Sequence, residues 1–286
     1  MVFSVTVDSM KNKYLFPLCL LLVIVLAARA SDYYLIPNNF FLHKGEKLIL
    51  RLLLGDYFEN EKGVQYQSAA TAKLVLHTGS KNTVDLKGIA KDADSAILSN
   101  YKLENTGLQL IEMDQVYPVV ELDRAALIKE LDQEQLTKLS EKASASFQQD
   151  IRERYTTYLK TLFTVDKPNG TVFNKELGQT LEIILEENPY KLGYGDDVTA
   201  LVKFKGAPLA NAHVDLVVKT SAGKIHPERL ASDASGHITF KLSLEGTYML
   251  RTVNIDVTKA KDVDYEKWGA AYTFAFANTR KLPDAY

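Results

Sequence analysis

The sequence has a single cysteine among 286 residues, and this cysteine, Cys19, falls inside an apolar run near the N-terminus. Residues 31–286 therefore contain no cysteine. This excludes disulfide bonds, thiolate catalysis and cysteine-ligated metal sites from that part of the chain. A chain without disulfides depends on its hydrophobic cores for stability. With 46% hydrophobic and 24% charged residues, the composition is that of an ordinary globular protein.

An excess of one charge is also missing. Lys and Arg total 34, Asp and Glu total 36, and the net charge is -2. Nucleic-acid binding requires a basic face, so we expect no nucleic-acid partner. The sequence has no G-x-S-x-G elbow, no G-x-G-x-x-G turn and no Walker loop. No two of the five histidines stand at an H-x-H or H-x-x-x-H spacing. We therefore predict no catalytic residues and a protein that is not an enzyme.

The N-terminus has the pattern of a secretory leader. Two lysines precede an apolar run at residues 15–28, which is shorter than the roughly 20 residues that span a bilayer. An Ala-x-Ala sequence ending at Ala30 supplies the small residues that signal peptidase requires. We predict a signal peptide at 1–30, cleaved after Ala30, and a periplasmic or secreted protein that is not an integral membrane protein. An uncleaved N-terminal anchor is the alternative, and translation starts at either Met1 or Met10.

Short segments with β-prone residues recur along the rest of the chain, bounded by turn residues. Candidate strands lie at 33–37, 47–54, 71–77, 83–89, 108–114, 117–122, 155–165, 181–185, 198–204, 214–218, 229–232, 237–242, 248–256 and 272–277. The sequence Asp-Ala-Ser-Gly at 233–236 predicts a hairpin turn between two of these strands.

One segment differs in composition. Residues 123–150 contain no Gly or Pro, and leucines recur there near helical spacing from Leu127 to Leu139. Asp123 is a suitable N-cap. We predict a mainly β fold of two β-sandwich-like domains joined by a short helical segment. The predicted boundaries are 31–122 for the N-terminal β domain, 123–154 for the helical linker and 155–286 for the C-terminal β-sandwich domain.

Aromatic residues are abundant, with 15 Tyr, 12 Phe and one Trp. Several of them flank the candidate strands and turns of the second half: Tyr155, Tyr158, Tyr190, Tyr194, Tyr265, Trp268 and Tyr272. Such a set either lines a carbohydrate or peptide site or packs between sandwiches. Packing is the favoured interpretation because no polar motif accompanies these residues.

Several blocks of sequence carry a family resemblance. They are Asp-Tyr-Tyr-Leu-Ile-Pro at 32–37, Arg-Glu-Arg-Tyr-Thr-Thr-Tyr-Leu-Lys-Thr-Leu at 152–162, Gly-Ala-Pro-Leu-Ala-Asn-Ala-His-Val at 206–214, Arg-Thr-Val-Asn at 251–254 and Asp-Tyr-Glu-Lys-Trp at 264–268. In order and spacing they resemble domain of unknown function family 4198, a bacterial periplasmic family often associated with nickel or cobalt uptake. The resemblance implies a C-terminal sandwich like the regulatory domains of carboxypeptidases.

The resemblance also implies a site near the mature N-terminus. The family often has histidines there and after its Arg-Thr-Val block, whereas this chain has Asp32 and Asn254. Asp32 is therefore the candidate ligand for a divalent metal, nickel or cobalt, with no cofactor established. Tyr33, Tyr34, Arg251 and Asn254 are the candidate ligand-binding residues, and a site is expected where they converge with Asp32.

These observations favour a non-enzymatic periplasmic binding or accessory protein. The resemblance links it to transition-metal or small-solute uptake, with an envelope transporter or receptor as the partner. The alternative is an envelope interaction module that binds protein or glycan through sandwich loops and aromatic residues.

Overall fold

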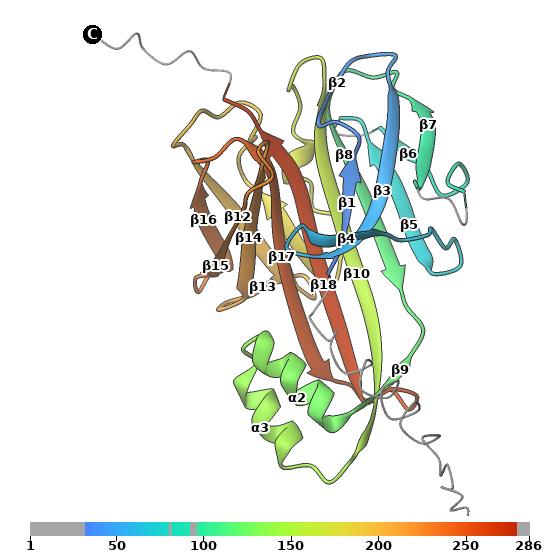
Figure 1. The fold of residues 1–286 in the computed structure, drawn as a ribbon, viewed down its shortest axis with the longest axis vertical. Coiled ribbons are helices and arrows are strands. Elements are labelled where there is room, and N and C mark those ends of the chain that lie inside the picture. Colours follow the sequence, from blue (N-terminus) through green and yellow to red (C-terminus); the bar gives the residue numbers. More distant parts are fainter. Residues whose placement is uncertain (1–31, 80–81, 92–95, 279–286) are drawn as a thin grey trace, which may run out of the picture. The chain divides into compact units, whose positions relative to one another are not determined.

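The computed structural model describes residues 32–79, 82–91 and 96–278, and the predicted leader at 1–30 lies outside them. In these residues the chain forms three β-sheets (Figure 1). The first small sheet contains β1 (Asp32–Pro37), β3 (Lys47–Asp56), β4 (Glu59–Gly63) and β7 (Leu98–Lys102). The second small sheet contains β11 (Leu181–Leu185), β12 (Asp197–Phe204), β13 (Ala207–Pro208) and β16 (His237–Lys241).

The central sheet has ten strands. Its main path runs in the order β15 (Ile225–Ala231), β14 (His213–Thr220), β17 (Gly246–Val257), β18 (Tyr265–Phe276), β10 (Asp150–Val165), β8 (Gly107–Val116), β5 (Thr71–His77) and β6 (Thr83–Asp85). β2 (Phe41–Leu42) and β9 (Val120–Asp123) also pair with β10. The mainly β prediction is confirmed.

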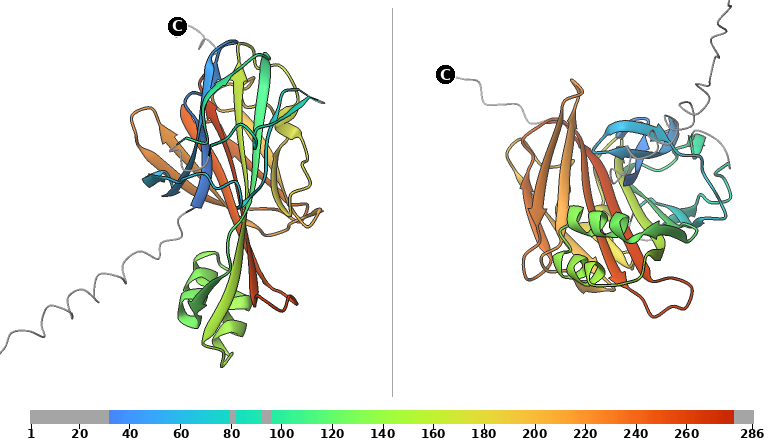
Figure 2. Two further views of the ribbon diagram at one scale, coloured as in Figure 1. Left: turned by 90° about the vertical axis from the view of Figure 1, so that its right-hand side faces the viewer. Right: turned by 60° about the horizontal axis from the view of Figure 1, so that its bottom comes forward.

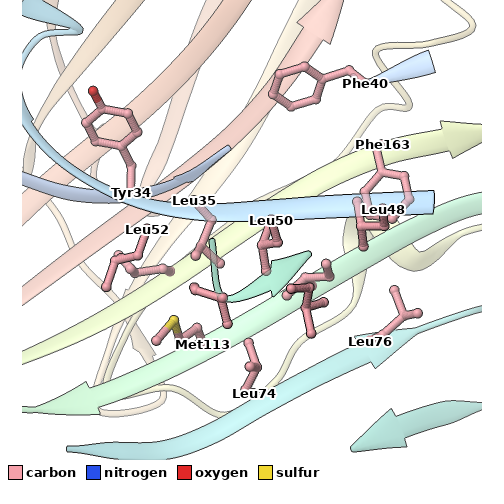
Figure 3. Packing of buried hydrophobic residues seen from close by; sticks show 14 of the residues in the cluster. Tyr34, Leu35, Phe40, Leu48, Leu50, Leu52, Leu74, Leu76, Met113 and Phe163 are labelled. Atoms are coloured by element: carbon pink, nitrogen blue, oxygen red, sulfur yellow. The ribbon is translucent and has the colours of Figure 1, made fainter. Parts of the chain in front are cut away.

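Alternating side chains of the central sheet build two separate cores, because successive residues of a strand point to opposite faces. On one face, Leu159 and Phe163 of β10 pack against the first small sheet, including Leu50 and Leu52 (Figure 3). On the other face, Leu162 of β10 belongs to the core shared with the second small sheet. Two sandwiches therefore share the central sheet as their common layer.

The strands β10 and β18 join the two halves of the sequence. They pair in parallel from Glu153 opposite Tyr265 to Thr161 opposite Thr273. Both run through the middle of the central sheet (Figure 1). The described residues belong to one compact unit, Ser31–Tyr286. The division into domains 31–122 and 155–286 stays a prediction about folding units, and strands from both segments share this sheet.

The predicted helical segment forms two helices, α2 (Arg124–Gln133) and α3 (Thr137–Ser144). Asp123 caps α2, since its Oδ1 accepts a hydrogen bond from the Ala126 N–H at 2.7 Å. Leu127 and Leu131 pack against Val253 and other residues of the central sheet. These residues form a third hydrophobic core, separate from the cores on the two faces described above. The helices lie over the ends of β17, β18 and β10 (Figure 2). Residues 150–154 of the predicted linker belong to β10.

One local prediction is wrong. The turn at 233–236 does form, because Asp233 Oδ1 accepts hydrogen bonds from the N–H groups of Ser235 and His237, and Gly236 has φ +82°. The flanking strands do not make a hairpin, since β15 pairs with β14 in the central sheet and β16 pairs with β12 in the second small sheet. The turn is therefore an arch, which connects β15 of the central sheet to β16 of the second small sheet. No helix in the described part of the chain is long and apolar enough to cross a membrane.

Candidate functional site

The guanidinium of Arg251 is surrounded by three carboxylates. Nε lies 2.7 Å from Asp32 Oδ2, and Nη2 donates a hydrogen bond to Asp32 Oδ1 at 2.9 Å. Nη1 donates to Asp215 Oδ2 at 2.8 Å, and Nη2 donates to Glu134 Oε1 at 2.6 Å. Arg251 is only 3% exposed and the three acids are also buried. We call these four residues the Arg251 cluster, and it lies between the first core and the helices.

Each member of the Arg251 cluster comes from a different element. Asp32 begins β1, Glu134 follows α2, Asp215 lies on β14, and Arg251 stands opposite Asp215 on β17. Buried charges are tolerated only when they are paired and hydrogen-bonded. The network therefore fixes β1 and the end of α2 onto the central sheet.

A second layer of contacts surrounds Asp215. Arg229 donates to its carboxylate through Nε at 2.6 Å and Nη2 at 3.0 Å, and the Tyr57 hydroxyl donates to Oδ2 at 2.8 Å. Arg229 Nη1 also donates to the Gln133 carbonyl at the end of α2. Tyr57 lies in the left-handed region, with φ 50°, in the turn between β3 and β4. The turn and the helices thus contact the same carboxylate network.

The electrostatics of the cluster are uneven. Burial raises the pKa of Asp32 to about 6, against the opposing attraction of Arg251. Burial acts in the same direction on Asp215, but hydrogen bonds from Arg229 and Arg251 outweigh it and lower its pKa. With three carboxylates and two guanidinium groups, the cluster and Arg229 together carry an excess of negative charge when all are ionised. Of the two aspartates, Asp32 therefore holds a proton more tightly than Asp215.

Three tyrosines stack beside the Arg251 cluster. The Tyr33 ring lies 4.8 Å from the Tyr117 ring at 19°, and the Tyr117 ring lies 5.7 Å from the Tyr155 ring at 22°. The Tyr117 hydroxyl donates to Gln115 Oε1 at 2.7 Å. All three tyrosines are partly exposed. We call Tyr33, Tyr117 and Tyr155 the tyrosine stack.

Exposed valines flank Tyr117 of the tyrosine stack in the sequence, and a charged side chain lies against Tyr155. Exposed fractions are 44% for Val116, 39% for Val119 and 50% for Val120. The charged side chain is Lys267, whose ammonium lies 4.5 Å from the centroid of the Tyr155 ring and forms an ion pair with Glu130. An aromatic surface that is both apolar and charged at its rim suits a binding role.

A glycine allows the Tyr155 ring to lie against the sheet. A Cβ atom at Gly269 would stand 2.4 Å from the Tyr155 hydroxyl oxygen and 3.1 Å from two ring carbons. Any larger residue at this position would therefore displace the ring. Gly269 is thus part of the site although it contributes no side chain.

Glu153 is the other unusual acid near the stack. It is 5% exposed, and its Oε2 has no hydrogen-bond partner among the described residues. Burial and the nearby Glu130 carboxylate raise its pKa to about 7, against the attraction of Lys267. Glu153 therefore holds its proton more tightly than an exposed glutamate does.

Three of the five candidate residues lie together. Asp32 and Arg251 are in direct contact, and Tyr33 follows Asp32 into the tyrosine stack. Tyr34 points into the first core, where its hydroxyl donates to Glu61 Oε1 at 2.9 Å. Asn254 pairs with Trp268 in the register of β17 and β18, on the opposite face of the sheet from Arg251. Both oxygens of Asp32 face Arg251, so a metal ion at Asp32 would have to replace the guanidinium.

The sequence interpretation missed Glu134, Asp215 and Tyr117. Asp215 had a detectable signal, because a charged residue inside the apolar run 214–218 needs a buried partner. Of the aromatic set expected to pack, Trp268 and Tyr272 do lie in the core on the second-sheet side, whereas Tyr194 is 61% exposed. Within residues 32–79, 82–91 and 96–278, no group of three or more His, Cys, Asp or Glu side chains is arranged to hold a metal ion.

Known proteins give limited comparisons. No curated protein matches the chain. One similar solved structure is a tetra-tandem repeat in the extending region of a large adhesion protein, with 10% identity, a TM-score of 0.22 and coverage of 87% of this chain and 50% of that one. The chain thus spans half the length of that structure. Another is the D0-D1 domain of intimin, with 10% identity, a TM-score of 0.22 and coverage of 86% and 98%.

The family comparison is decisive by contrast. The family model described as "Domain of unknown function (DUF4198)" matches residues 28–256, which is most of the sequence. The match includes Asp32, Tyr33, Tyr117, Tyr155 and Arg251. The resemblance noted in the sequence is confirmed, and the chain belongs to the DUF4198 family.

Proposed function

We propose that this protein is a non-enzymatic binding protein of the cell envelope, exported by its leader, and that a partner protein docks on the tyrosine stack. The observation that carries the proposal is the partly exposed stack of Tyr33, Tyr117 and Tyr155, together with the exposed Val116, Val119 and Val120 that flank Tyr117 in the sequence. In this proposal the protein serves the uptake of nickel, cobalt or a small solute, and its partner is an envelope transporter or receptor.

The rigidity of the stack supports docking. Tyrosine is enriched where a few residues supply most of the binding energy, since it offers a large apolar face and a hydroxyl. Residues that are already fixed lose little conformational entropy on binding. Here Tyr117 is fixed by its hydroxyl and by the backbone hydrogen bond from its N–H to the Tyr155 carbonyl at 2.9 Å.

The valines favour a protein over a glycan. Three exposed aliphatic side chains flank Tyr117 in the sequence, and they add no hydrogen-bonding groups. Sugars require both stacking and several polar contacts, whereas the centre of a protein interface is apolar with a polar rim. Lys267 and Glu130 would contribute to that rim.

Site-specific photocrosslinking in the native host tests the proposal. The full-length protein carries p-benzoylphenylalanine at Val119, and a control protein carries it at Tyr194, which is 61% exposed beside the second small sheet. We expect one discrete protein adduct from position 119 and none from position 194. Tyr117→Ala should reduce the adduct at least about fivefold, since hot-spot truncations cost more than 1 kcal/mol.

Two results would contradict protein docking. One is an adduct of the same size and yield from both positions, or one that Tyr117→Ala leaves unchanged. The other is an adduct that glycosidases digest, which would replace the protein partner with a glycan.

Titration of the purified protein with Ni²⁺ and Co²⁺, followed by thermal unfolding, tests separately whether metal binds the protein itself, since a ligand of the native state raises its stability.

A further inference from the structure

Residues 175–180 form an irregular strap between the 3-10 turn η1 (Val172–Asn174) and β11. The strap lies against the face of the central sheet that carries Lys160, and its Leu177 packs against the second core. Most of its polar contacts are made to side chains that change charge with pH, as the next paragraphs describe. We call this segment the strap, and its properties do not depend on the tyrosine stack.

Two carboxylates hold the middle of the strap. The N–H groups of Leu177 and Gly178 donate to the two oxygens of Glu182 at 2.7 and 3.0 Å. Gln179 Nε2 donates to Asp114 Oδ1 at 2.7 Å. Burial raises the pKa of Asp114 to about 6, against the hydrogen bond from Gln179. Mild acid therefore neutralises Asp114, and a hydrogen bond to a neutral acceptor is weaker than one to a carboxylate.

His77 holds the start of the strap. Lys175 Nζ lies 2.9 Å from His77 Nδ1, and because an ammonium group can only donate, Nδ1 is the acceptor and carries no proton. The proton of the neutral ring is then on Nε2, which lies 3.4 Å from Glu112 Oε1. His77 and Glu112 are 4% and 5% exposed, and Glu112 Oε2 has no hydrogen-bond partner in the described part of the chain. A protonated His77 would thus find a carboxylate on one side and a cation on the other.

The end of the strap is held differently. The Tyr158 hydroxyl donates to Thr180 Oγ1 at 2.9 Å, and the Lys205 N–H donates to the Thr180 carbonyl at 2.6 Å. Neither contact depends on a group that titrates in mild acid. Glu176 pairs with Lys203 at the surface, where water screens the pair. Acid therefore weakens the start and the middle of the strap but leaves its attachment to β11.

The charges around His77 balance only while its ring is neutral. They are three ammonium groups and three carboxylates: Lys73 on β5, Lys160 on β10, Lys175 on the strap, Glu112 and Asp114 on β8, and Glu182 on β11. On the remaining neighbour, β6, the uncharged Thr83 stands opposite His77. A proton on His77 adds a fourth positive charge to this buried layer and places it beside Lys175.

We propose that the strap is released by acid and that His77 is the group that triggers its release. At neutral pH, His77 accepts the hydrogen bond from Lys175 and the strap stays closed. Histidine gains its charge between about pH 8 and 5, and the charged ring can no longer accept from Lys175 but pairs with Glu112 through Nε2. Lys175 is half-exposed, so its ammonium group moves into water and takes the start of the strap with it. Opening exposes the second core at Leu177 together with the charged layer below it.

Hydrogen–deuterium exchange of the purified full-length protein tests the proposal, because local opening controls the exchange of the Leu177 and Gly178 amides. Rates at about pH 7.5 and about pH 5 are compared after correction for the intrinsic effect of pH. We expect residues 175–180 to exchange about tenfold faster in acid, the factor that about 1.4 kcal/mol produces. The amides of β12 should stay protected at both pH values.

Two variants separate the trigger from its partner. His77→Asn places an amide oxygen where Nδ1 stood, which accepts from Lys175 at either pH, so the acceleration in acid should be largely lost. Lys175→Met should speed exchange of the strap at neutral pH and reduce the effect of acid. The matched control is His237→Asn, which removes a histidine paired with Glu186 at 3.2 Å on the second small sheet and should keep the full effect.

Three results would overturn the proposal. One is equal corrected exchange of residues 175–180 at the two pH values. Another is loss of protection in β12 together with the strap, which would mean general unfolding in acid. The third is an acid effect of unchanged size in folded His77→Asn or, where thermal unfolding shows that this variant does not fold, in Lys175→Met.

Discussion

Asp32 and Arg251 are 219 positions apart in the chain, yet their side chains meet through two pairs of atoms at 2.7 and 2.9 Å. The contact ties the first described strand to β17 near the C-terminal end of the sequence. It also brings Tyr33, the neighbour of Asp32, to its place in the tyrosine stack. The carboxylate of Asp32 therefore acts mainly as an anchor for β1.

Removing the charge of Arg251 should be strongly destabilising. Arg251→Gln leaves Asp32, Glu134 and Asp215 buried with only Arg229 as a nearby guanidinium. Loss of one partner of a buried ion pair costs about 3–5 kcal/mol. Urea unfolding of the variant and the wild type measures the difference.

Arg152→Gln is the matched control for that experiment. Arg152 also pairs with an aspartate, Asp264 at 3.0 Å, but its side chain is 40% exposed. Exposed pairs contribute little because water screens them. A loss of stability in Arg251→Gln no greater than that in Arg152→Gln would show that the Arg251 cluster does not anchor the fold.

The stability should rise as the pH falls through the range in which Glu153 titrates. Its pKa is raised from 4.5 to about 7 in the folded protein, so the folded state binds this proton more tightly than the unfolded state. The stabilisation is fully present below pH 4.5 and is lost as the pH rises through about 7, a change of about 3 kcal/mol. Free energies of unfolding from about pH 4.5 to 8 provide the test.

Glu153→Gln isolates this contribution. The glutamine stays neutral, so the variant should gain stability relative to the wild type as the pH rises, and the difference should level off above about pH 8. Asp32, with its pKa raised to about 6, keeps a smaller dependence of the same sign in both proteins. Asp215 acts in the opposite direction but only as the pH falls below about 4, since its pKa is lowered. Parallel curves for the two proteins would disprove the assignment to Glu153.

Gly269→Ala should disturb the tyrosine stack. The new Cβ would lie 2.4 Å from the Tyr155 hydroxyl oxygen, and overpacking of this kind costs about 1–3 kcal/mol. Adding Tyr155→Phe removes that oxygen and should restore part of the loss. Gly63→Ala is the control, because no heavy atom lies within 4 Å of the position that a Cβ atom would take there. Equal thermal unfolding of the two alanine variants would contradict this role of Gly269.

Lys160 lies on the face of the central sheet opposite to Arg251, and its buried ion pair with Glu182 can be tested separately. Lys160 Nζ donates to Glu182 Oε1 at 2.7 Å, and the two side chains are 2% and 1% exposed. Lys160→Met leaves the Glu182 carboxylate with only the N–H groups of Leu177 and Gly178, which should cost about 3–5 kcal/mol.

Adding Glu182→Gln to Lys160→Met removes the unpaired charge and should recover part of the stability. A double-mutant cycle measured by urea unfolding gives the coupling between the two residues. Additive losses would mean that the pair contributes no interaction of its own.

Local patterns in the sequence located most of the strands. β5 and β11 begin and end where hydrophobic alternation and turn residues placed them, and Asp123 caps α2 as predicted. The predicted strand at 83–89 ends early, at Asp85, since Leu86 accepts hydrogen bonds from Ile89 and Ala90 in a turn. These features depend on neighbouring residues, so a short window of sequence contains the information.

The sequence did not predict which strands pair with one another. Alternation tells which residues share a face, but it does not name the sheet that a strand joins, as the arch after β15 illustrates. Asp32 and Arg251 were grouped through the family resemblance alone. Tyr117 and Tyr155 meet only because the chain after β8 returns to β10, and such a contact has no signature in either local sequence.

The position of β18 has a consequence for protein synthesis. It is the last strand described, yet it lies between β17 and β10 inside the central sheet. The edge of β10 that pairs with it stays unfilled while the chain is being made. The two halves of the central sheet can join only after residues 265–276 have been synthesised, because β18 pairs with both β17 and β10.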